Sequence, residues 1–459
     1  MTDRTCEEAL LDFASGLTIA DIPDAVLRHA KGLLLDQFGI QLACRDLPWV
    51  AQVRDYVLDT AKPGPCTVVG TSARLHPEAA ALINGTAGHA FEADDYCPTA
   101  SAHPGCVVTP PALALAEARG STGEEMLVAF VAGAETVVRL ARATMPSMLY
   151  ERGFHETCAH GVFGGAVAAA RLLRLNRDQA LSALGIAGSH ASGTTEFTHS
   201  GGDVKRLHGG LGAAGGVRGA LLAERGLTGP RQVLGGKRGF LHSFSPRPDP
   251  TWLTDGLGED WQLLNVLVKP YCCAGRIIPE IDALLDIVAA TGITAADVAT
   301  IRVGADKGAF VHGVTALDDG PIDAITAQFS NQVAVALAMV KGRNDFTTYH
   351  DLLKAGGLHD RTVVDLARRV ELYVDEQADR AYPGAFDAAV TVHTTDGREL
   401  SARAIASRDH APDFDRIVAK FEDFTATALT PDERKAVVHE VTTLESAASA
   451  DTLAALLRA

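Results

Sequence analysis

A cluster of acidic side chains close to a histidine is the first feature of the sequence with the means to carry out chemistry. Glu92, Asp94 and Asp95 occupy three of four consecutive positions, and His103 follows after a short loop. Crowded carboxylates repel one another, so at least one of them is expected to have a raised pKa. A histidine held beside them can donate or accept a proton near neutral pH. The pattern predicts an acid–base site; the alternative is a turn with solvated acids.

A basic segment in the middle of the chain supplies the opposite charge. Lys205 and Arg206 follow two glycines, and His208 leads into an Ala/Gly-rich helix that we expect to begin at Gly209. Cations beside a helix N-terminus form an anion site, because the unpaired N–H groups add to their field. The segment lacks the GxxxxGK[ST] pattern of a phosphate-binding loop. Because the chain as a whole is acidic, we interpret this segment as a carboxylate site rather than as a solvated basic turn.

Two further segments contain residues suited to the same site. Lys269 lies at the expected domain boundary, where ligand clefts tend to form, and Arg276 is nearby. Either side chain could bind a second carboxylate of the substrate. The adjacent Cys272-Cys273 pair is expected in the core, since no histidine partner can be assigned to it.

His155 precedes a helix that we expect to start near Gly161. Thr157 or His160 is a candidate cap for that helix, and His155 is a candidate to face the cleft.

Several classes of protein are excluded by what the chain lacks. The sequence contains no HExxH, no GxSxG and no GxGxxG in a strand–helix context, so proton transfer is the chemistry that remains. No cofactor is predicted. The eight cysteines show no zinc-ligand spacing, so no metal site is predicted and reduced thiols in the cytoplasm are expected.

The net charge of the chain limits the classes of molecule that it is expected to bind. The 459 residues carry a formal net charge of -16, which argues against nucleic acid and against anionic membrane surfaces. No signal peptide and no apolar run of membrane-spanning length is visible. A small anionic molecule is therefore the expected partner.

The elements that must position these residues fall into two groups. The first half has helical periodicity, in segments rich in Ala and Gly that are typical of closely packed helices. These segments are 24–44, 77–90, 109–118, 123–144, 161–175, 177–189 and 209–226.

After residue 261 the pattern changes. Strands are expected at 299–303 and 369–374, a hairpin at 388–404 around Asp396-Gly397, and helices at 277–290 and 324–340. The tail from 413 to 457 is helical again. We predict a mainly α protein, with a large all-helical domain (1–265 and 405–459) and a smaller α+β lid domain (266–404).

At these residues the sequence resembles the MmgE/PrpD family, whose members include dehydratases, decarboxylases and epimerases of small polycarboxylates. The resemblance covers nearly the whole chain. Its motifs are Asn84-Gly85 to His89, Asp94-Asp95, His103-Pro104, Gly153-Phe154-His155, Lys205 to Gly210, Lys269-Pro270-Tyr271 and Gln328-Phe329-Ser330.

The resemblance implies a homodimer with the site between the two domains and no metal. It assigns catalytic roles to His103, Asp95, Glu92, Lys205 and Lys269. It makes His155 a neighbour of the substrate, and we predict further substrate-binding residues: Asp94, Tyr96, Arg206, His208 and Arg276.

Departures from the family pattern bear on the reaction. Glu92 stands where Asp is frequent, Tyr96 where Thr is common, and Ile278 where His is frequent. Val333 aligns with a tyrosine of the decarboxylase members. The length of the acidic loop and Pro98 are closer to the epimerase-like members. A dehydratase or epimerase is therefore expected, with a cis-aconitate-type decarboxylase or a non-catalytic polycarboxylate-binding relative as alternatives. An aconitase-like lyase would need three cluster-binding cysteines.

Overall fold

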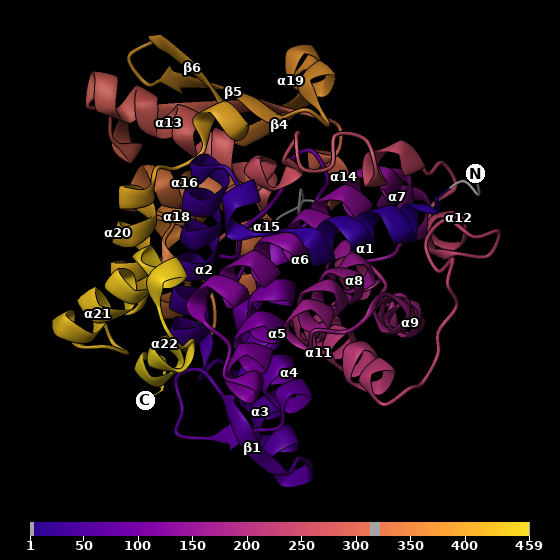
Figure 1. The fold of residues 1–459 in the computed structure, drawn as a ribbon. Helices are drawn as coiled ribbons and strands as arrows, with labels where there is room; N and C mark the ends of the chain where they lie inside the picture. The colour runs from indigo at the N-terminus through magenta and orange to yellow at the C-terminus, as the bar shows by residue number, and fades with distance from the viewer. Residues whose placement is uncertain (1–3, 313–321, 459) are drawn as a thin grey trace. The chain divides into compact units, whose positions relative to one another are not determined.

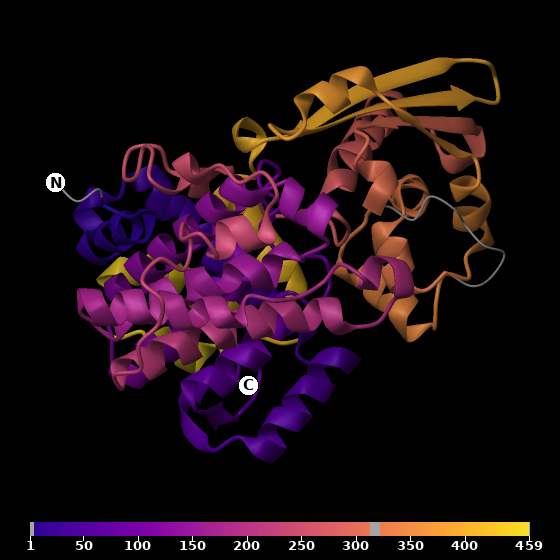
Figure 2. The same cartoon turned by 90° about the vertical axis from the view of Figure 1, so that its right-hand side faces the viewer.

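The computed structural model describes residues 4–312 and 322–458 and divides into two compact units (Figures 1 and 2). Unit 1 comprises Met1–Ala90, Asp94–Val268 and Pro412–Ala459. Unit 2 comprises Phe91–Ala93 and Lys269–Ala411. The chain thus leaves unit 1 for three residues within the acidic loop, which the sequence-based division did not anticipate.

Unit 1 is built almost entirely from helices. The helices are α1 (Cys6–Gly16), α2 (Asp24–Cys44), α3 (Pro48–Thr60), α4 (Pro77–Gly88), α5 (Pro104–Arg119), α6 (Gly123–Thr144), α7 (Ser147–Arg152), α8 (Glu156–Leu172), α9 (Arg177–Ala187), α10 (Phe197–Ser200), α11 (Val204–Glu224), α12 (Phe240–Phe244), α20 (Phe414–Phe424), α21 (Pro431–Thr442) and α22 (Asp451–Leu456). A short antiparallel pair, β1 (Pro63–Thr67) and β2 (Arg74–Leu75), completes it.

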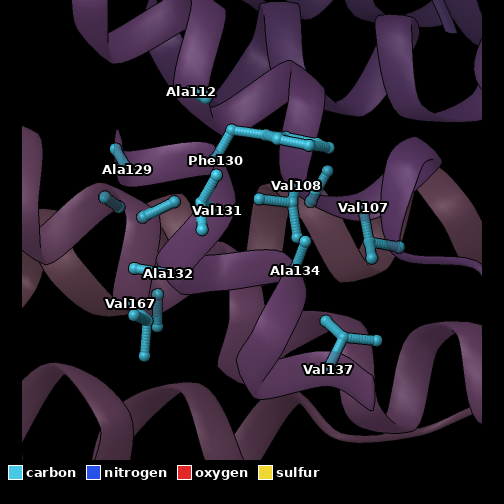
Figure 3. Packing of buried hydrophobic residues seen from close by; sticks show 14 of the residues in the cluster. Val107, Val108, Ala112, Ala129, Phe130, Val131, Ala132, Ala134, Val137 and Val167 are labelled. Carbon is cyan, nitrogen blue, oxygen red and sulfur yellow. The ribbon is translucent and has the colours of Figure 1, made fainter. Parts of the chain in front are cut away.

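The core of unit 1 lies where α5, α6 and α8 pack on one another. Figure 3 shows buried side chains of these helices, among them Val108 of α5, Phe130 of α6 and Val167 of α8. Most of their neighbours are alanine and valine. Small side chains let helix backbones approach closely, and close packing of this kind stabilises the scaffold on which the polar residues are mounted.

Unit 2 contains a four-stranded sheet in the order β4-β3-β5-β6. The strands are β3 (Val298–Ala305), β4 (Val370–Val374), β5 (Phe386–Thr394) and β6 (Glu399–Ala406). β3 is parallel to β4 and antiparallel to β5, and β5 and β6 form the hairpin predicted around Asp396-Gly397. The helices are α13 (Ile278–Thr291), α14 (Ala309–His312), α15 (Ala324–Phe329), α16 (Asn331–Lys341), α17 (Phe346–Lys354), α18 (Arg361–Ala367) and α19 (Glu376–Ala381). Helix α13 packs on β5 and β6.

The predicted fold class, mainly α with a smaller α+β part, is confirmed. Helices α2 and α6 begin and end at the predicted residues. Several predicted boundaries are wrong. Helix α11 begins at Val204 rather than Gly209, and the helix expected over 324–340 is interrupted. Ser330 ends α15, and its hydroxyl accepts the Val333 N–H at the start of α16 (3.3 Å).

Among the described residues, no helix combines the length and the apolar character needed to cross a lipid bilayer.

Candidate active site

The acidic loop starts where α4 ends, and its first polar pair is buried. His89 follows the last residue of α4, and its Nδ1 lies 2.6 Å from Oδ2 of Asp94. Both side chains are almost inaccessible to solvent. A buried carboxylate needs hydrogen-bond partners, and the imidazole supplies one. His89 lies inside one of the motifs that resemble the family, but the sequence alone predicts no role for it.

The carboxylate of Asp95 contacts the start of helix α5. Its carboxylate accepts the Gly105 N–H at the start of α5, at 3.0 and 3.1 Å. Burial raises its pKa well above the ordinary value, and the nearby Asp94 raises it further. The expectation of a raised pKa among the crowded acids is therefore met at Asp95. Its carboxylate binds the helix start, and it is the main-chain oxygen of Asp95 that contacts the ring of His103.

His103 directly precedes α5, and a backbone group holds its ring. Its Nδ1 lies 2.6 Å from the main-chain oxygen of Asp95. A carbonyl oxygen can only accept, so Nδ1 carries the hydrogen and proton exchange is directed to Nε2. Asp94 Oδ2 lies 3.5 Å from Nδ1, and Glu156 Oε1 lies 3.8 Å from Nε2. The ring retains 13% exposure, more than the buried histidines beside it.

Two further histidines form a direct imidazole pair. His155 Nδ1 and His208 Nδ1 are 2.8 Å apart, although His155 directly precedes α8, His208 lies in α11 and the two are 53 positions apart in the chain. Burial lowers the pKa of His155 well below its usual value and that of His208 to about 4, and neighbouring positive charge acts in the same direction. Both rings are therefore neutral at pH 7, with one ring donating and the other accepting.

Thr157 lies between this pair and the acidic loop. Its hydroxyl is 3.5 Å from His155 Nε2 and 3.5 Å from His89 Nε2. From the sequence, Thr157 was considered only as a helix cap. Helix α8 begins at Glu156, so Thr157 lies inside the first turn and does not cap it. No spacing in the sequence relates Thr157 to His89, 68 positions away.

Two glycines allow α4 and α11 to approach each other closely. A Cβ on Gly209 would lie 2.6 Å from the Gly85 oxygen and 2.7 Å from the His89 Cβ. A larger residue at Gly209 would therefore push α11 away from the histidines. The close packing of α4 and α11 also brings the first turn of α11 near His89.

Lys205 and Arg206 belong to that first turn and are buried. The positive field of Lys205 contributes to the lowered pKa of both His155 and His208. The guanidinium carbon of Arg206 lies 5.1 Å from the ring centre of Trp49. Arg206 thus makes a cation–π contact with Trp49.

Unit 2 contains Lys269 and Glu92, which is the first acidic residue of the loop. Lys269 Nζ lies 3.3 Å from the main-chain oxygen of Glu92 and 3.5 Å from its Oε2, and both residues are buried. Glu92 has a φ of 55°, in the left-handed region that is uncommon for a residue other than glycine. Burial raises the pKa of Cys273 well above its usual value, so its thiol is not a ready nucleophile.

Two predicted substrate neighbours have structural partners instead. Arg276 forms an ion pair with Asp306, and its guanidinium carbon lies 4.4 Å from the ring centre of Tyr382. Tyr96 is buried, and its backbone pairs with that of Leu267. Their role as neighbours of the substrate stays a prediction.

One group of side chains within the described residues has the donor atoms for a metal ion. His89, Asp94 and Cys106 each place a ligand atom within 4.8 Å of the other two, and all three residues are buried. We call this group the donor trio. Nitrogen, oxygen and sulfur donors together suit Zn²⁺. No local spacing in the sequence indicates this group, because His89 directly follows α4, Asp94 lies in the loop and Cys106 lies in α5.

Comparison with known proteins assigns the chain to a family. It matches the MmgE/PrpD N-terminal domain over residues 8–253 and the MmgE/PrpD C-terminal domain over residues 271–444. The chain therefore belongs to the MmgE/PrpD family.

Relatives within the family are named for one activity. The chain is 29% identical to a cis-aconitate decarboxylase-like protein of Aspergillus oryzae, over 100% of this chain and 99% of that protein. It is 29% identical to a cis-aconitate decarboxylase of Aspergillus terreus, over 85% and 82% of the two chains. The human cis-aconitate decarboxylase is 31% identical over 55% of this chain and 54% of its own. These relatives support a lyase at the level of the family.

Proposed function

We propose that this protein is a lyase of small di- or tricarboxylates that works by proton transfer without a cofactor. The observation that carries the proposal is the ring orientation of His103, whose Nδ1–H is bound by a backbone carbonyl. Such a ring is held in place and exchanges a proton at Nε2. The buried carboxylates and imidazoles around it are typical of sites that perform acid–base chemistry.

The reaction that the relatives' names favour is decarboxylation of a cis-aconitate-like substrate. Loss of CO₂ leaves a carbanion next to an unsaturated or carboxylate group, and His103 then donates the proton from Nε2 to carbon. A positioned acid of this kind contributes roughly 10²–10⁴ in rate.

A second candidate is dehydration or epimerisation through the same type of intermediate. It is favoured by Val333, which is fully buried in α16 and brings no hydroxyl to the position where the resemblance places a tyrosine in decarboxylases. In these reactions His103 removes a proton from carbon instead of delivering one.

Positive charge for the substrate carboxylates is proposed to come from Lys205 and Lys269. Lys205 lies in the first turn of a 21-residue helix, where the helix dipole adds to its field. Lys269 is next to Glu92, and a single residue separates Glu92 from Asp94 in the chain. The homodimer implied by the resemblance is also a proposal, which analytical ultracentrifugation tests.

The deciding experiment is incubation of the protein with a panel of polycarboxylates in D₂O, followed by NMR. Cis-aconitate, 2-methylcitrate and citrate form the panel. A product that has lost CO₂ and gained deuterium at carbon identifies a decarboxylase, a new alkene identifies a dehydratase, and exchange at an otherwise unchanged carbon identifies an epimerase. Absence of all three changes, with every substrate, would contradict the proposal.

A further inference from the structure

The first residue of helix α8 places a carboxylate among the histidines of the candidate site. Oε1 of Glu156 lies 3.8 Å from Nε2 of His103 and also 3.8 Å from Nε2 of His155. Glu156 and His155 are buried, and the ring of His103 is largely so. The proposed function assigns no task to Glu156, although its carboxylate lies beside the nitrogen at which the substrate is expected to react.

The separation between Glu156 and His103 suits a third group that contacts both. At 3.8 Å the two atoms are beyond the roughly 3.2 Å of an ordinary N···O hydrogen bond. The hydrogen of the neutral His103 ring is on Nδ1, which contacts a main-chain oxygen, so Nε2 is an acceptor. A carboxylate oxygen is an acceptor too. A substrate atom that donates hydrogen bonds can therefore lie about 2.8 Å from each of them.

The charge of Glu156 makes the same distinction among the groups of a substrate. Glu156 is the first residue of a 17-residue helix, and the N-terminus of a helix stabilises a negative charge. A fixed carboxylate repels a substrate carboxylate placed next to it, whereas it attracts O–H and N–H groups. We therefore expect a hydrogen-bond donor of the substrate, and not one of its carboxylates, to lie beside Glu156.

We propose that Glu156 is a specificity-determining residue, which selects polycarboxylates that carry a hydroxyl or amino group next to the reacting carbon. The inference rests on the proposed function, in which that carbon meets Nε2 of His103. A carbon about 3.2 Å from Nε2 is at most about 7 Å from Oε1 of Glu156. A group on the neighbouring carbon extends about 2.5 Å further, so it can reach the carboxylate.

An amino group is expected to bind more tightly than a hydroxyl. A hydroxyl has one hydrogen to donate, whereas an amino group has at least two and can serve both acceptors at once. A protonated amino group also adds a positive charge, and hydrogen bonds between charged groups are roughly twice as strong as those between neutral groups.

The same reasoning disfavours substrates whose only polar groups are carboxylates. Cis-aconitate has three carboxylates and a carbon–carbon double bond, and it has no hydroxyl or amino group. Citrate has a hydroxyl on the same carbon frame. Glu156 thus favours the second candidate of the proposed function, dehydration or epimerisation, because a dehydratase needs a hydroxyl on its substrate.

The test compares the binding of molecules that differ in one substituent. Succinate, malate and aspartate share a four-carbon dicarboxylate frame and carry hydrogen, hydroxyl and ammonium at one carbon. Isothermal titration calorimetry with each enantiomer measures their affinities. We expect the better malate enantiomer to bind about tenfold or more tightly than succinate, and aspartate about threefold or more tightly than malate. Tricarballylate and citrate make the hydrogen–hydroxyl comparison on a six-carbon frame.

Two variants separate the charge of Glu156 from its hydrogen bond. Glu156→Ala removes both, so the three affinities should converge to within about twofold. Glu156→Gln keeps the size and an acceptor oxygen but has no charge. In this variant malate should keep part of its advantage over succinate, while aspartate loses its advantage over malate. A variant that merely loosens the site would weaken all three probes alike and leave these ratios unchanged.

A matched control is available in the same unit. Glu124 is an exposed acid in the first turn of α6, and Glu124→Ala should leave every affinity as it is in the wild type. Equal binding of succinate, malate and aspartate to the wild type, or a preference that survives Glu156→Ala, would overturn the inference and leave the proposed function intact. Failure of all five probes to bind would overturn both.

Discussion

The stability of unit 2 is expected to depend on pH through a single buried acid. Glu280 lies in the first turn of α13 and has no exposed surface. Its Oε1 accepts the Asn331 amide at 2.6 Å, and its Oε2 has no hydrogen-bond partner in the described residues. Burial raises the pKa of Glu280 from 4.5 to about 8, with a smaller contribution from Asp306. The native protein therefore keeps this carboxyl protonated at neutral pH.

The sign of the effect follows from proton linkage. Between pH 4.5 and about 8 the folded protein holds a proton that the unfolded chain has lost, so the free energy of unfolding falls as the pH rises. The contribution is fully present below pH 4.5. At 1.36 kcal/mol per pKa unit, about 5 kcal/mol is lost by pH 8 and about 3 kcal/mol by pH 7.

Glu280→Gln removes this dependence. The glutamine oxygen can still accept the Asn331 amide, while its new NH₂ group is buried without an acceptor, at a cost of about 1–3 kcal/mol at every pH. The variant should therefore be less stable than the wild type at pH 5 and more stable at pH 8. The two free energies of unfolding should cross near pH 6.

Urea unfolding at pH 5, 6, 7 and 8 measures the difference, but the two units need separate probes. All three tryptophans lie in unit 1, so their fluorescence reports that unit, and amide exchange in β5 reports unit 2. Glu376→Gln is the control, since Glu376 is exposed in the same unit. Wild-type and Glu280→Gln stabilities that run parallel across this pH range would refute the reasoning.

Three further outcomes are expected at the site. His103→Gln should reduce kcat by about 10²–10⁴ with the fold intact, whereas His160→Gln, at a buried histidine that contacts Thr144, should not; equal losses in both would remove the role of His103. Lys205→Ala should raise KM for polycarboxylates, and unchanged kinetic constants would refute carboxylate binding by this lysine. Zn²⁺ should inhibit by binding the donor trio, and Cys106→Ser should weaken that inhibition; calorimetric titration checks the binding, and identical affinity in the variant would exclude the thiol as a ligand.

Local patterns were enough to predict most of the helices and the hairpin. Helix α6 begins at a capping box formed by Thr122 and Glu125, and its apolar face continues along its whole length. Both of its ends could therefore be predicted. Helix α5 was predicted to begin five residues too late, at Thr109. Pro104 and Gly105 are typical of loops, yet proline suits the first helical position.

The sequence was enough to predict the types of residue in the candidate site, but not which side chains contact one another. The sequence identified His103, His155 and His208 as polar residues near a cleft. It did not reveal that His155 and His208 share a hydrogen bond, or that Thr157 reaches His89, because both contacts join helices far apart in the chain. Such contacts depend on the close approach of α4, α8 and α11, which no local spacing encodes.

The charge state of the histidines limits which reaction the site can complete unaided. His208, with a pKa of about 4, and His155, with a pKa lowered well below its usual value, hold no spare proton at pH 7. Decarboxylation replaces CO₂ by hydrogen and so takes up one proton from solvent in each turnover, whereas dehydration and epimerisation take up none. Trapping and counting one CO₂ released per product molecule would therefore identify decarboxylation directly. A turnover without CO₂ release would assign the same histidines to dehydration or epimerisation.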